Sequence, residues 1–207
     1  SLNPLMHDVK KQKNSFIGFN HLILPVYFYE YKKNISMNKN VFIFFGGHDH
    51  KKLTLRILKI LNKNDLNLNL FISSLFKKLF YGMKINKKII FYNHNQYIQK
   101  LNLCKIAITA GGMSLFDNVV MKKKIICIPQ YKHQEINAKR IASKNAINLL
   151  NSSNKNFEKK FNEIFIKLYK DVSLSKKIIL KQNKISNMSK LHKTLLLIGK
   201  IYEQSHN

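Results

Sequence analysis

Two pairs of adjacent glycines mark the positions where this chain is best equipped to do chemistry. Gly46 and Gly47 follow one apolar, β-type run, and Gly111 and Gly112 follow another. A segment with helical spacing comes after each pair. A glycine turn between a buried strand and a helix lets backbone N–H groups and the positive end of the helix approach an anion, because no Cβ blocks the way. We therefore predict two turns that bind phosphate.

The residues just after the second turn add hydrogen-bonding groups of the kind that bind a nucleotide. In TAGGMSLFD, Ser114 can cap the following helix or donate to a phosphate oxygen, and we expect Asp117 on the first turn of that helix. A carboxylate there can accept hydrogen bonds from ribose hydroxyls while the glycine amides hold the phosphates. The alternative is structural: Ser114 only caps the helix, and Asp117 only complements its dipole.

A third set of polar side chains follows a later apolar run that ends at Pro129. Gln130, His133, Gln134 and Asn137 fall on a loop and on the opening of a helix, where their side chains can reach the same cleft. The spacing of Gln134 and Asn137 places both on one side of that helix. The competing interpretation is a solvated helix face.

The histidines and cysteines of the chain do not predict a metal site. His48, Asp49 and His50 follow the first glycine pair, but two histidines without a third ligand argue only weakly for a metal. We expect solvated loop residues there, with His48 or the Gly47 backbone near a phosphate. Both cysteines lie in apolar runs, where cysteine behaves as a small buried hydrophobe. The sequence contains no serine-histidine-aspartate arrangement or P-loop lysine motif, and we predict neither a metal nor a cofactor.

The order of apolar runs and helical segments predicts the fold that must position these residues. From residue 41 onward, most of the β-type runs are separated by segments of helical spacing, such as 53–61 and 134–142. That alternation indicates βαβ units and a parallel sheet. Strands that are apolar throughout are typical of a sheet covered on both faces. We predict an α/β, Rossmann-like parallel sheet with helices on both faces, which binds ligands at the carboxyl ends of its strands. The runs are VFIFF, LNLFIS, KKIIFY, KIAITA and KIICIP.

Beyond about residue 151 the pattern is helical throughout. Residues 157–172 and 189–204 each place apolar side chains at helical intervals. The first residues show no clear period, and the chain begins with Ser1 rather than Met, so we expect a remnant of a preceding portion or a linker there. The sequence thus divides into a remnant or linker, a Rossmann-like domain and a helical C-terminal cap, over 1–19, 20–150 and 151–207.

The formal net charge of +27 raises nucleic acid as a partner, since lysines that neutralise phosphates bind it. Against this, arginine occurs only at Arg56 and Arg140, and the lysines are spread along the whole length among abundant Asn and Ile. That pattern is a compositional bias, and no recognition motif accompanies it. We predict no nucleic-acid partner and at most a peripheral contact with an anionic membrane. With no secretory signal and no apolar stretch near the roughly 20 residues of a membrane helix, we expect a cytoplasmic protein.

The glycine turns and the polar helix resemble a known family. FFGGHDHKKLTLRILKIL, followed by KIAITAGGMSLFDNVVMKKKIICIPQYKHQEINAKRI, is similar to the C-terminal domain of UDP-2,4-diacetamido-2,4,6-trideoxy-β-L-altropyranose hydrolase, an enzyme of pseudaminic acid biosynthesis. That enzyme is itself similar to family 28 glycosyltransferases of the GT-B fold. The resemblance runs from about residue 20 to about residue 146. It implies the C-terminal half of a GT-B fold.

The resemblance also implies that this chain holds a UDP-sugar. Ser114 falls in its diphosphate turn, Asp117 stands where the family usually places a ribose-binding Glu, and His48 stands where it usually has Ser. A uracil contact is implied within residues 91–99, with no single residue marked. The full set implied for UDP-sugar binding is Gly46, Gly47, His48, Gly111, Gly112, Ser114, Asp117, Gln134 and Asn137.

The family's other half has no counterpart in this sequence. That half is an N-terminal Rossmann-like domain with a Gly-rich loop and the histidine thought to help activate water, so we assign no catalytic residue here. The resemblance implies the UDP-sugar-binding half of a hydrolase that releases UDP from a diacetamido-trideoxy sugar. The chain is then either a piece of a longer enzyme or a partner of a separate N-terminal-half subunit. Two alternatives stay open: a family 28-like glycosyltransferase C-terminal domain, and a non-catalytic binding module that pairs with a separate subunit.

Overall fold

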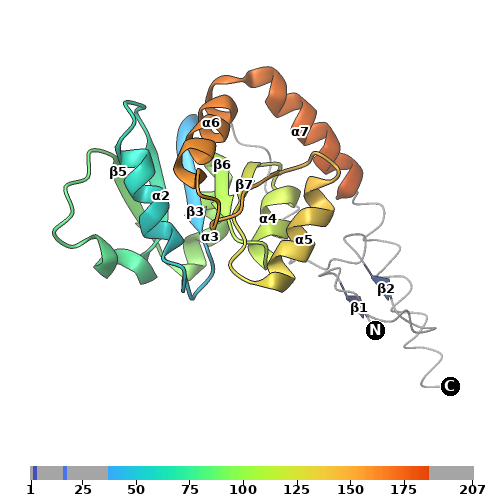
Figure 1. Cartoon of the computed structure of the whole chain (residues 1–207), viewed down its shortest axis with the longest axis horizontal. Helices are drawn as coiled ribbons and strands as arrows, with labels where there is room; N and C mark the ends of the chain where they lie inside the picture. The colour runs from blue at the N-terminus through green and yellow to red at the C-terminus, as the bar shows by residue number, and fades with distance from the viewer. Residues whose placement is uncertain (1, 4–15, 18–36, 187–207) are drawn as a thin grey trace.

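Five apolar runs and a short sixth segment pair side by side as one parallel sheet (Figure 1). The structure, a computed structural model, describes residues 2–3, 16–17 and 37–186. Two further strands of two residues each pair with one another in parallel, β1 (Leu2–Asn3) and β2 (Phe16–Ile17). The strands of the main sheet are β3 (Met37–Phe44), β4 (Asn69–Ser73), β5 (Lys88–Tyr92), β6 (Cys104–Thr109), β7 (Lys124–Cys127) and β8 (Asn148–Leu149).

The order of the strands across the sheet is β5-β4-β3-β6-β7-β8. Counted along the chain, this is the order of the doubly wound folds that bind dinucleotides. The chain winds from β3 outward to β4 and β5, then returns to the other side of β3 with β6. Ile43 pairs with Ile108, and Phe44 pairs with Thr109. The carboxyl ends of β3 and β6 therefore lie side by side where the direction of winding reverses.

Helices cover both faces of the sheet, as the sequence predicted, because alternate residues of each strand point to opposite faces. The face that carries Val41 and Ile43 packs against α2 and α6. The opposite face, which carries Phe42, Ala107 and Ile125, packs against α3, α4 and α5. The helices are α2 (Leu53–Asn62), α3 (Tyr97–Asn102), α4 (Met113–Val120), α5 (Lys132–Ala142), α6 (Phe157–Lys170) and α7 (Val172–Ile185), with two 3₁₀ segments, η2 (Ser74–Phe80) and η3 (His94–Gln96).

The described part of the C-terminal cap shares its core with the sheet. Phe157, Phe161 and Phe165 lie along one side of α6, and each is 0% exposed. They belong to the same apolar cluster as Val41 and Leu70 of the sheet. The helical pattern over 157–172 is therefore confirmed as a helix that completes one face of the domain, although α6 ends at Lys170 and Val172 begins α7. The predicted helix over 189–204 and the segment 20–36 lie outside the described residues.

One connection and one strand differ from the expected alternation. The 3₁₀ segment η2, and no α-helix, joins β4 to β5 within the described chain. The last strand, β8, was not predicted because two residues are too short to give a periodic signal. Both cysteines are buried and free, as expected for small core residues. None of the helices in the described residues is both long enough and apolar enough to cross a membrane.

Candidate functional site

The two glycine pairs lie at the carboxyl ends of the two central strands of the sheet. Gly46 and Gly47 follow the carboxyl end of β3, and Gly111 and Gly112 follow the carboxyl end of β6. Because β3 and β6 are hydrogen-bonded neighbours, the two turns are neighbours as well. Ligands of doubly wound sheets bind at this place, outside the carboxyl ends of the strands at the reversal of winding.

The second turn is closely packed behind and open in front. A Cβ built on Gly111 would lie 2.2 Å from the carbonyl oxygen of Gln134 in α5, so only glycine fits there. Gly112 is the N-cap residue of α4 and has no side chain with which to cap that helix end. The first amides of a helix have no acceptor within the helix. The amide of Leu115 donates to the carbonyl oxygen of Gly112 at 3.0 Å, so the start of α4 offers an anion the amides of Met113 and Ser114 and the positive end of the helix dipole.

Ser114 does not cap α4, contrary to one of the two roles that the sequence predicted. It lies within the first turn of the helix, only 8% exposed. Its hydroxyl oxygen is 2.7 Å from the hydroxyl oxygen of Thr109 at the end of β6. Each hydroxyl carries one hydrogen, and their mutual bond uses only one of the two. The Thr109–Ser114 pair therefore joins α4 to β6 and retains one O–H donor for a further acceptor.

Asp117 lies on the second turn of α4, one turn later than predicted, and the first turn contains no acidic residue. Interaction with a helix dipole falls off within the first turn, so this carboxylate does little for the dipole. Its Oδ2 accepts a hydrogen bond of 3.1 Å from the hydroxyl of Tyr97. Burial raises the pKa of Asp117 from 3.8 to about 6, and the hydrogen bond from Tyr97 acts in the opposite direction.

Tyr97 is the polar residue that sequence reasoning missed. It opens α3, and its ring packs edge-on against Phe42 and Phe44 with centroid separations of 5.3 and 5.2 Å. Strand β3 thus fixes the ring, and the hydroxyl reaches Asp117. The only signal for it was its place within residues 91–99, where the resemblance implied a base contact.

The first turn differs from the second because its helix is already capped. The two carboxylate oxygens of Asp49 accept hydrogen bonds from the amides of Leu53 and Thr54, at 2.9 and 2.7 Å. The expectation that Asp49 is a solvated loop residue is therefore wrong, and the start of α2 carries its own anion. Gly46 has a φ of +93°, a conformation that favours glycine. Because Asp49 already occupies the amides at the start of α2, a phosphate at this turn could bind only to the backbone of the loop.

Gln130 joins the first turn to the loop after β7. Its side-chain nitrogen donates to the carbonyl oxygen of Phe45 at 2.8 Å, and its side-chain oxygen accepts from the amide of Lys51 at 3.3 Å. Its own amide donates to the side-chain oxygen of Gln134 at 2.9 Å. Gln130 therefore holds both ends of the loop that contains Gly46 and Gly47.

Asn137 makes the corresponding contact with the second turn. Its side-chain nitrogen donates to the carbonyl oxygen of Gly111 at 3.3 Å. Gln130, Gln134 and Asn137 are 4, 9 and 0% exposed, so the interpretation as a solvated helix face is wrong for these three residues, whereas His133 is exposed. We call these three residues the amide brace, because they tie both glycine turns to the start of α5.

A column of rings lies beside the brace. His50 stacks on Tyr131 with a centroid separation of 4.6 Å, and His48 and His133 extend the column at 6.5 and 5.5 Å. These rings connect the loop after β3 with the loop after β7. Among the described residues no group of three His, Cys, Asp or Glu side chains is placed to hold a metal ion.

A cavity of about 770 Å³ opens at the carboxyl ends of β7 and β8. Its size is within the usual range for small-molecule sites. Lys51, Gln130, Tyr131 and Lys139 contribute to its wall. None of the nine residues predicted to bind a UDP-sugar is among its described lining residues. The cavity therefore lies beside the glycine turns and shares with them only the brace residue Gln130.

Comparison with known proteins finds matches among solved structures alone. No protein-family model and no curated protein matches the chain. MurG of Acinetobacter baumannii matches with a TM-score of 0.65 and 18% identity, over 84% of this chain and 53% of that one. The spinosyn rhamnosyltransferase SpnG complexed with thymidine diphosphate matches with a TM-score of 0.64 and 16% identity, over 97% and 56%. The spinosyn forosaminyltransferase SpnP matches with a TM-score of 0.60 and 16% identity, over 90% and 49%.

These likenesses establish a shared fold. They agree with the strand order, with the reversal of winding between β3 and β6, and with helices on both faces. They are consistent with the C-terminal half that the sequence predicted. The chain therefore has the α/β, Rossmann-like fold of the GT-B glycosyltransferases and spans about half the length of these solved structures.

Proposed function

We propose that this chain is the half of a GT-B-type enzyme that binds a UDP-sugar, with the diphosphate at the carboxyl ends of β3 and β6. The pairing of these two strands carries the proposal, because it brings both glycine turns to the reversal of winding. The sequence resemblance supplies UDP as the nucleotide. SpnG complexed with thymidine diphosphate and VinC complexed with dTDP support a nucleoside diphosphate on this fold.

The two turns have different tasks in this proposal. The open start of α4, with the amides after Gly112, binds the phosphate group that carries more of the negative charge. The loop at Gly46 and Gly47 adds backbone donors from the other side. These groups stabilise the negative charge that develops on UDP as its bond to the sugar breaks.

Asp117 and Tyr97 hold the ribose. An ionised carboxylate accepts hydrogen bonds from sugar hydroxyls, and the Tyr97 hydroxyl fixes its orientation through Oδ2. The second oxygen, Oδ1, is then the acceptor for the ribose. Asp117 is shorter than the Glu usual in the resembled family, and the contact from Tyr97 positions it.

The acceptor of the sugar separates two forms of the proposal. The sequence resemblance favours water, which makes the assembled enzyme a hydrolase. The spinosyn transferases among the solved structures favour transfer to an acceptor molecule. We propose hydrolysis by an assembly in which a separate or preceding N-terminal half supplies the groups that activate water.

Product analysis distinguishes these reactions. The chain is combined with a supplied N-terminal half and a UDP-sugar, with and without an acceptor, and released UDP is measured. UDP release without acceptor supports hydrolysis, and release only with acceptor supports transfer. No UDP release in either case would count against an enzymatic role and favour a binding module.

Calorimetry tests nucleotide binding by the chain itself. We expect UDP to bind more tightly than ADP or phosphate, and Asp117→Ala to weaken UDP binding by about tenfold or more, because a hydrogen bond to a charged group is worth about 1.5–3 kcal/mol. Asp65→Ala removes an exposed carboxylate outside the site and serves as the matched control. Equal binding of UDP and phosphate, or equal losses in the two variants, would refute the site.

The raised pKa of Asp117 gives UDP binding a pH dependence. Above about pH 6 the carboxyl is ionised and accepts from ribose, and below that value it becomes protonated. We expect UDP affinity to fall by up to about tenfold per pH unit below 6. Asp117→Asn removes this contribution and leaves the titration of every other group unchanged. Identical calorimetric pH profiles for wild type and Asp117→Asn would contradict the assignment.

The same shift has a stability consequence of defined sign. Since the pKa in the folded state is about 6 and the ordinary value is 3.8, ionisation of Asp117 opposes folding. This opposition is fully present above about pH 6 and disappears as the pH falls towards 3.8. Unfolding curves at several pH values, compared between wild type and Asp117→Asn, report it without any ligand.

A further inference from the structure

A second surface lies on the other side of β3 from the glycine turn after β6, where η2 follows the carboxyl end of β4. Phe76 and Phe80 of η2 point inward, are 9 and 8% exposed and belong to the core of the sheet. Leu75 and Leu79 each precede one of these phenylalanines and are 70 and 41% exposed, and Tyr81 is 71% exposed. We call Leu75, Leu79 and Tyr81 the η2 tip.

The η2 tip is a local concentration of exposed apolar side chains. Three of the nine large exposed hydrophobic residues in the described chain lie within the seven positions 75–81. Leu75 and Leu79 alternate along the segment with the two buried phenylalanines, and both are exposed. Phe76 and Phe80 anchor η2 from below, so the tip is held outward by a fixed backbone.

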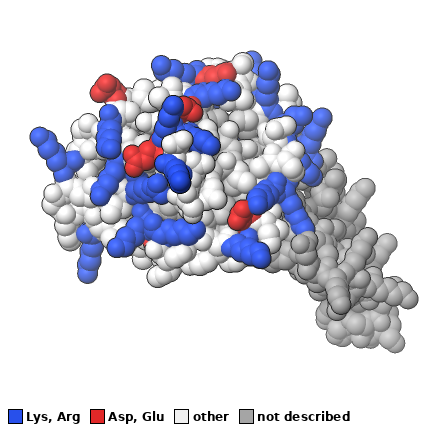
Figure 2. Space-filling model, in the orientation of Figure 1, with Lys and Arg blue, Asp and Glu red and all other residues white. Residues whose placement is uncertain are grey.

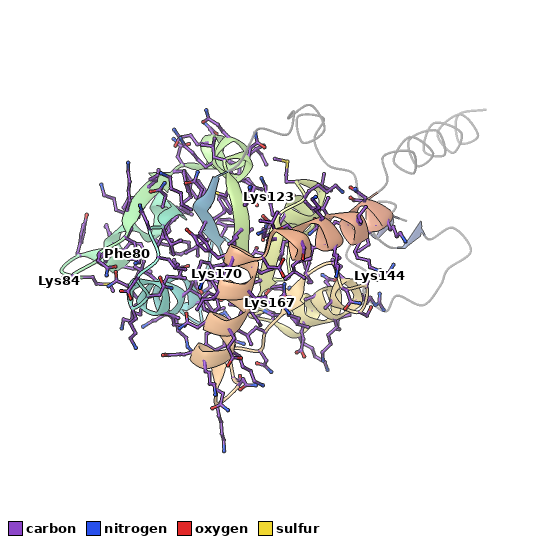
Figure 3. The ribbon with its side chains drawn as sticks, turned by 90° about the horizontal axis from the view of Figure 1, so that it is seen from above. Phe80, Lys84, Lys123, Lys144, Lys167 and Lys170 are labelled. Carbon is purple, nitrogen blue, oxygen red and sulfur yellow. The ribbon has the colours of Figure 1, made fainter. Side chains whose placement is uncertain are left out.

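The chain segment that carries the η2 tip has charged residues of one sign. Residues 66–116 contain seven lysines and no aspartate, glutamate or arginine. Lys77, Lys78 and Lys84 are exposed next to the tip. Figure 3 shows Lys84 at the far end of the molecule and Phe80 nearer the body. Lysines and arginines are spread over the whole face seen in Figure 2, so positive charge alone does not distinguish one surface from another. The η2 tip is distinguished by lysines that lie next to exposed leucines.

We infer that the η2 tip docks this chain on an anionic lipid surface. Exposed Leu and Tyr side chains enter the boundary between headgroups and acyl chains, and the neighbouring lysines remain among the anionic headgroups. Nucleic acid would use the lysines but offers no apolar phase for Leu75 and Leu79. This inference is independent of the proposed UDP site, because no residue of the tip belongs to that site.

Vesicle sedimentation tests the inference with the full chain. The probes are vesicles of phosphatidylcholine alone and of phosphatidylcholine with about one-third phosphatidylserine. The variant Leu75→Ser/Leu79→Ser/Tyr81→Ser is compared with Val172→Ser/Leu180→Ser on α7, whose two residues are both 62% exposed. We expect the η2 variant to lose at least tenfold in partition coefficient on the anionic vesicles, and the α7 variant to lose less than twofold.

A second comparison of two variants tests the contribution of the lysines. Lys77→Gln/Lys78→Gln is compared with Lys159→Gln/Lys160→Gln on α6, where both lysines are also exposed. Because the net charge is +27, we expect some of the protein to adsorb to anionic vesicles in other orientations. The test is therefore the difference in vesicle binding between the two lysine variants. We expect Lys77→Gln/Lys78→Gln to lower the partition coefficient on anionic vesicles severalfold, and Lys159→Gln/Lys160→Gln to leave it unchanged.

Several outcomes would overturn the inference. These are equal losses in the η2 and α7 variants, equal losses in the two lysine variants, no binding of wild type, or equal binding to both kinds of vesicle. Binding of an acidic protein or an oligonucleotide that depends on the lysines but not on the η2 tip would also overturn it. Circular dichroism confirms folding of every variant, and UDP calorimetry on the η2 variant separates this result from a failure of the nucleotide site.

Discussion

Gly111→Ala is expected to lower the free energy of unfolding by about 2 kcal/mol or more and to abolish UDP binding. The new methyl group would lie 2.2 Å from the carbonyl oxygen and 2.7 Å from the carbonyl carbon of Gln134. Both are backbone atoms of α5, so no side-chain rotation relieves the overlap. The helix has to move away from the turn, which breaks the bond from Asn137 to the Gly111 carbonyl.

Gly47→Ala is the matched control for the effect of this change on stability. A Cβ at Gly47 would meet no described atom within 4 Å, and its φ lies outside the left-handed region. We expect a change within about 0.5 kcal/mol in the free energy of unfolding. Urea denaturation of both variants measures the difference. A Gly111→Ala protein as stable as Gly47→Ala would show that α5 does not rest on the second turn.

Phe161→Ala is expected to cost about 3–5 kcal/mol, the usual penalty for truncating a buried phenylalanine. Its ring is 0% exposed and stacks between Phe157 and Phe165 with centroid separations of 6.2 and 5.9 Å. The cluster also contains Val41 and Leu70 of the sheet. Loss of this ring therefore destabilises the sheet along with the helix.

Ile166→Ala on the same helix provides the comparison, since Ile166 is 37% exposed. We expect it to cost about 1 kcal/mol or less. Denaturation followed by hydrogen exchange at the backbone amides of α6 and of the sheet strands reports whether cap and sheet unfold together. Two separate transitions, with only one shifted by Phe161→Ala, would mean that the cap over 151–207 is an independent unit.

Much of the fold could be predicted from the sequence because its signals are local. The runs around Val41, Ile106 and Ile125 are apolar throughout, and the segments after them have helical spacing. Short connections and right-handed crossovers leave few topologies for such a pattern. Strand β8 escaped notice because two residues, Asn148 and Leu149, cannot show a period.

The candidate site was predictable in position but less so in detail. Glycine pairs at strand ends gave its location. The roles of Asp49, Gln130 and Ser114 depend on which of several hydrogen-bond partners each side chain meets. Gln130 meets the carbonyl of Phe45, 85 residues earlier, and no local pattern encodes that contact. Tyr97 was missed for the same reason, since its partner Asp117 belongs to a different helix.

The amide brace fixes the spacing between the two glycine turns. Gln130 is hydrogen-bonded to the loop after β3, and Asn137 is hydrogen-bonded to the loop after β6. Gln130 and Asn137 belong to one segment, in which the side chain of Gln134 accepts a hydrogen bond from the Gln130 amide. A displacement of one loop is therefore coupled to a displacement of the other. The spacing between the two glycine turns is thereby fixed without a ligand. If both turns bind phosphate as proposed, a ligand with a single anionic group would contact only one of them, so the length of the ligand as well as its charge would determine its affinity.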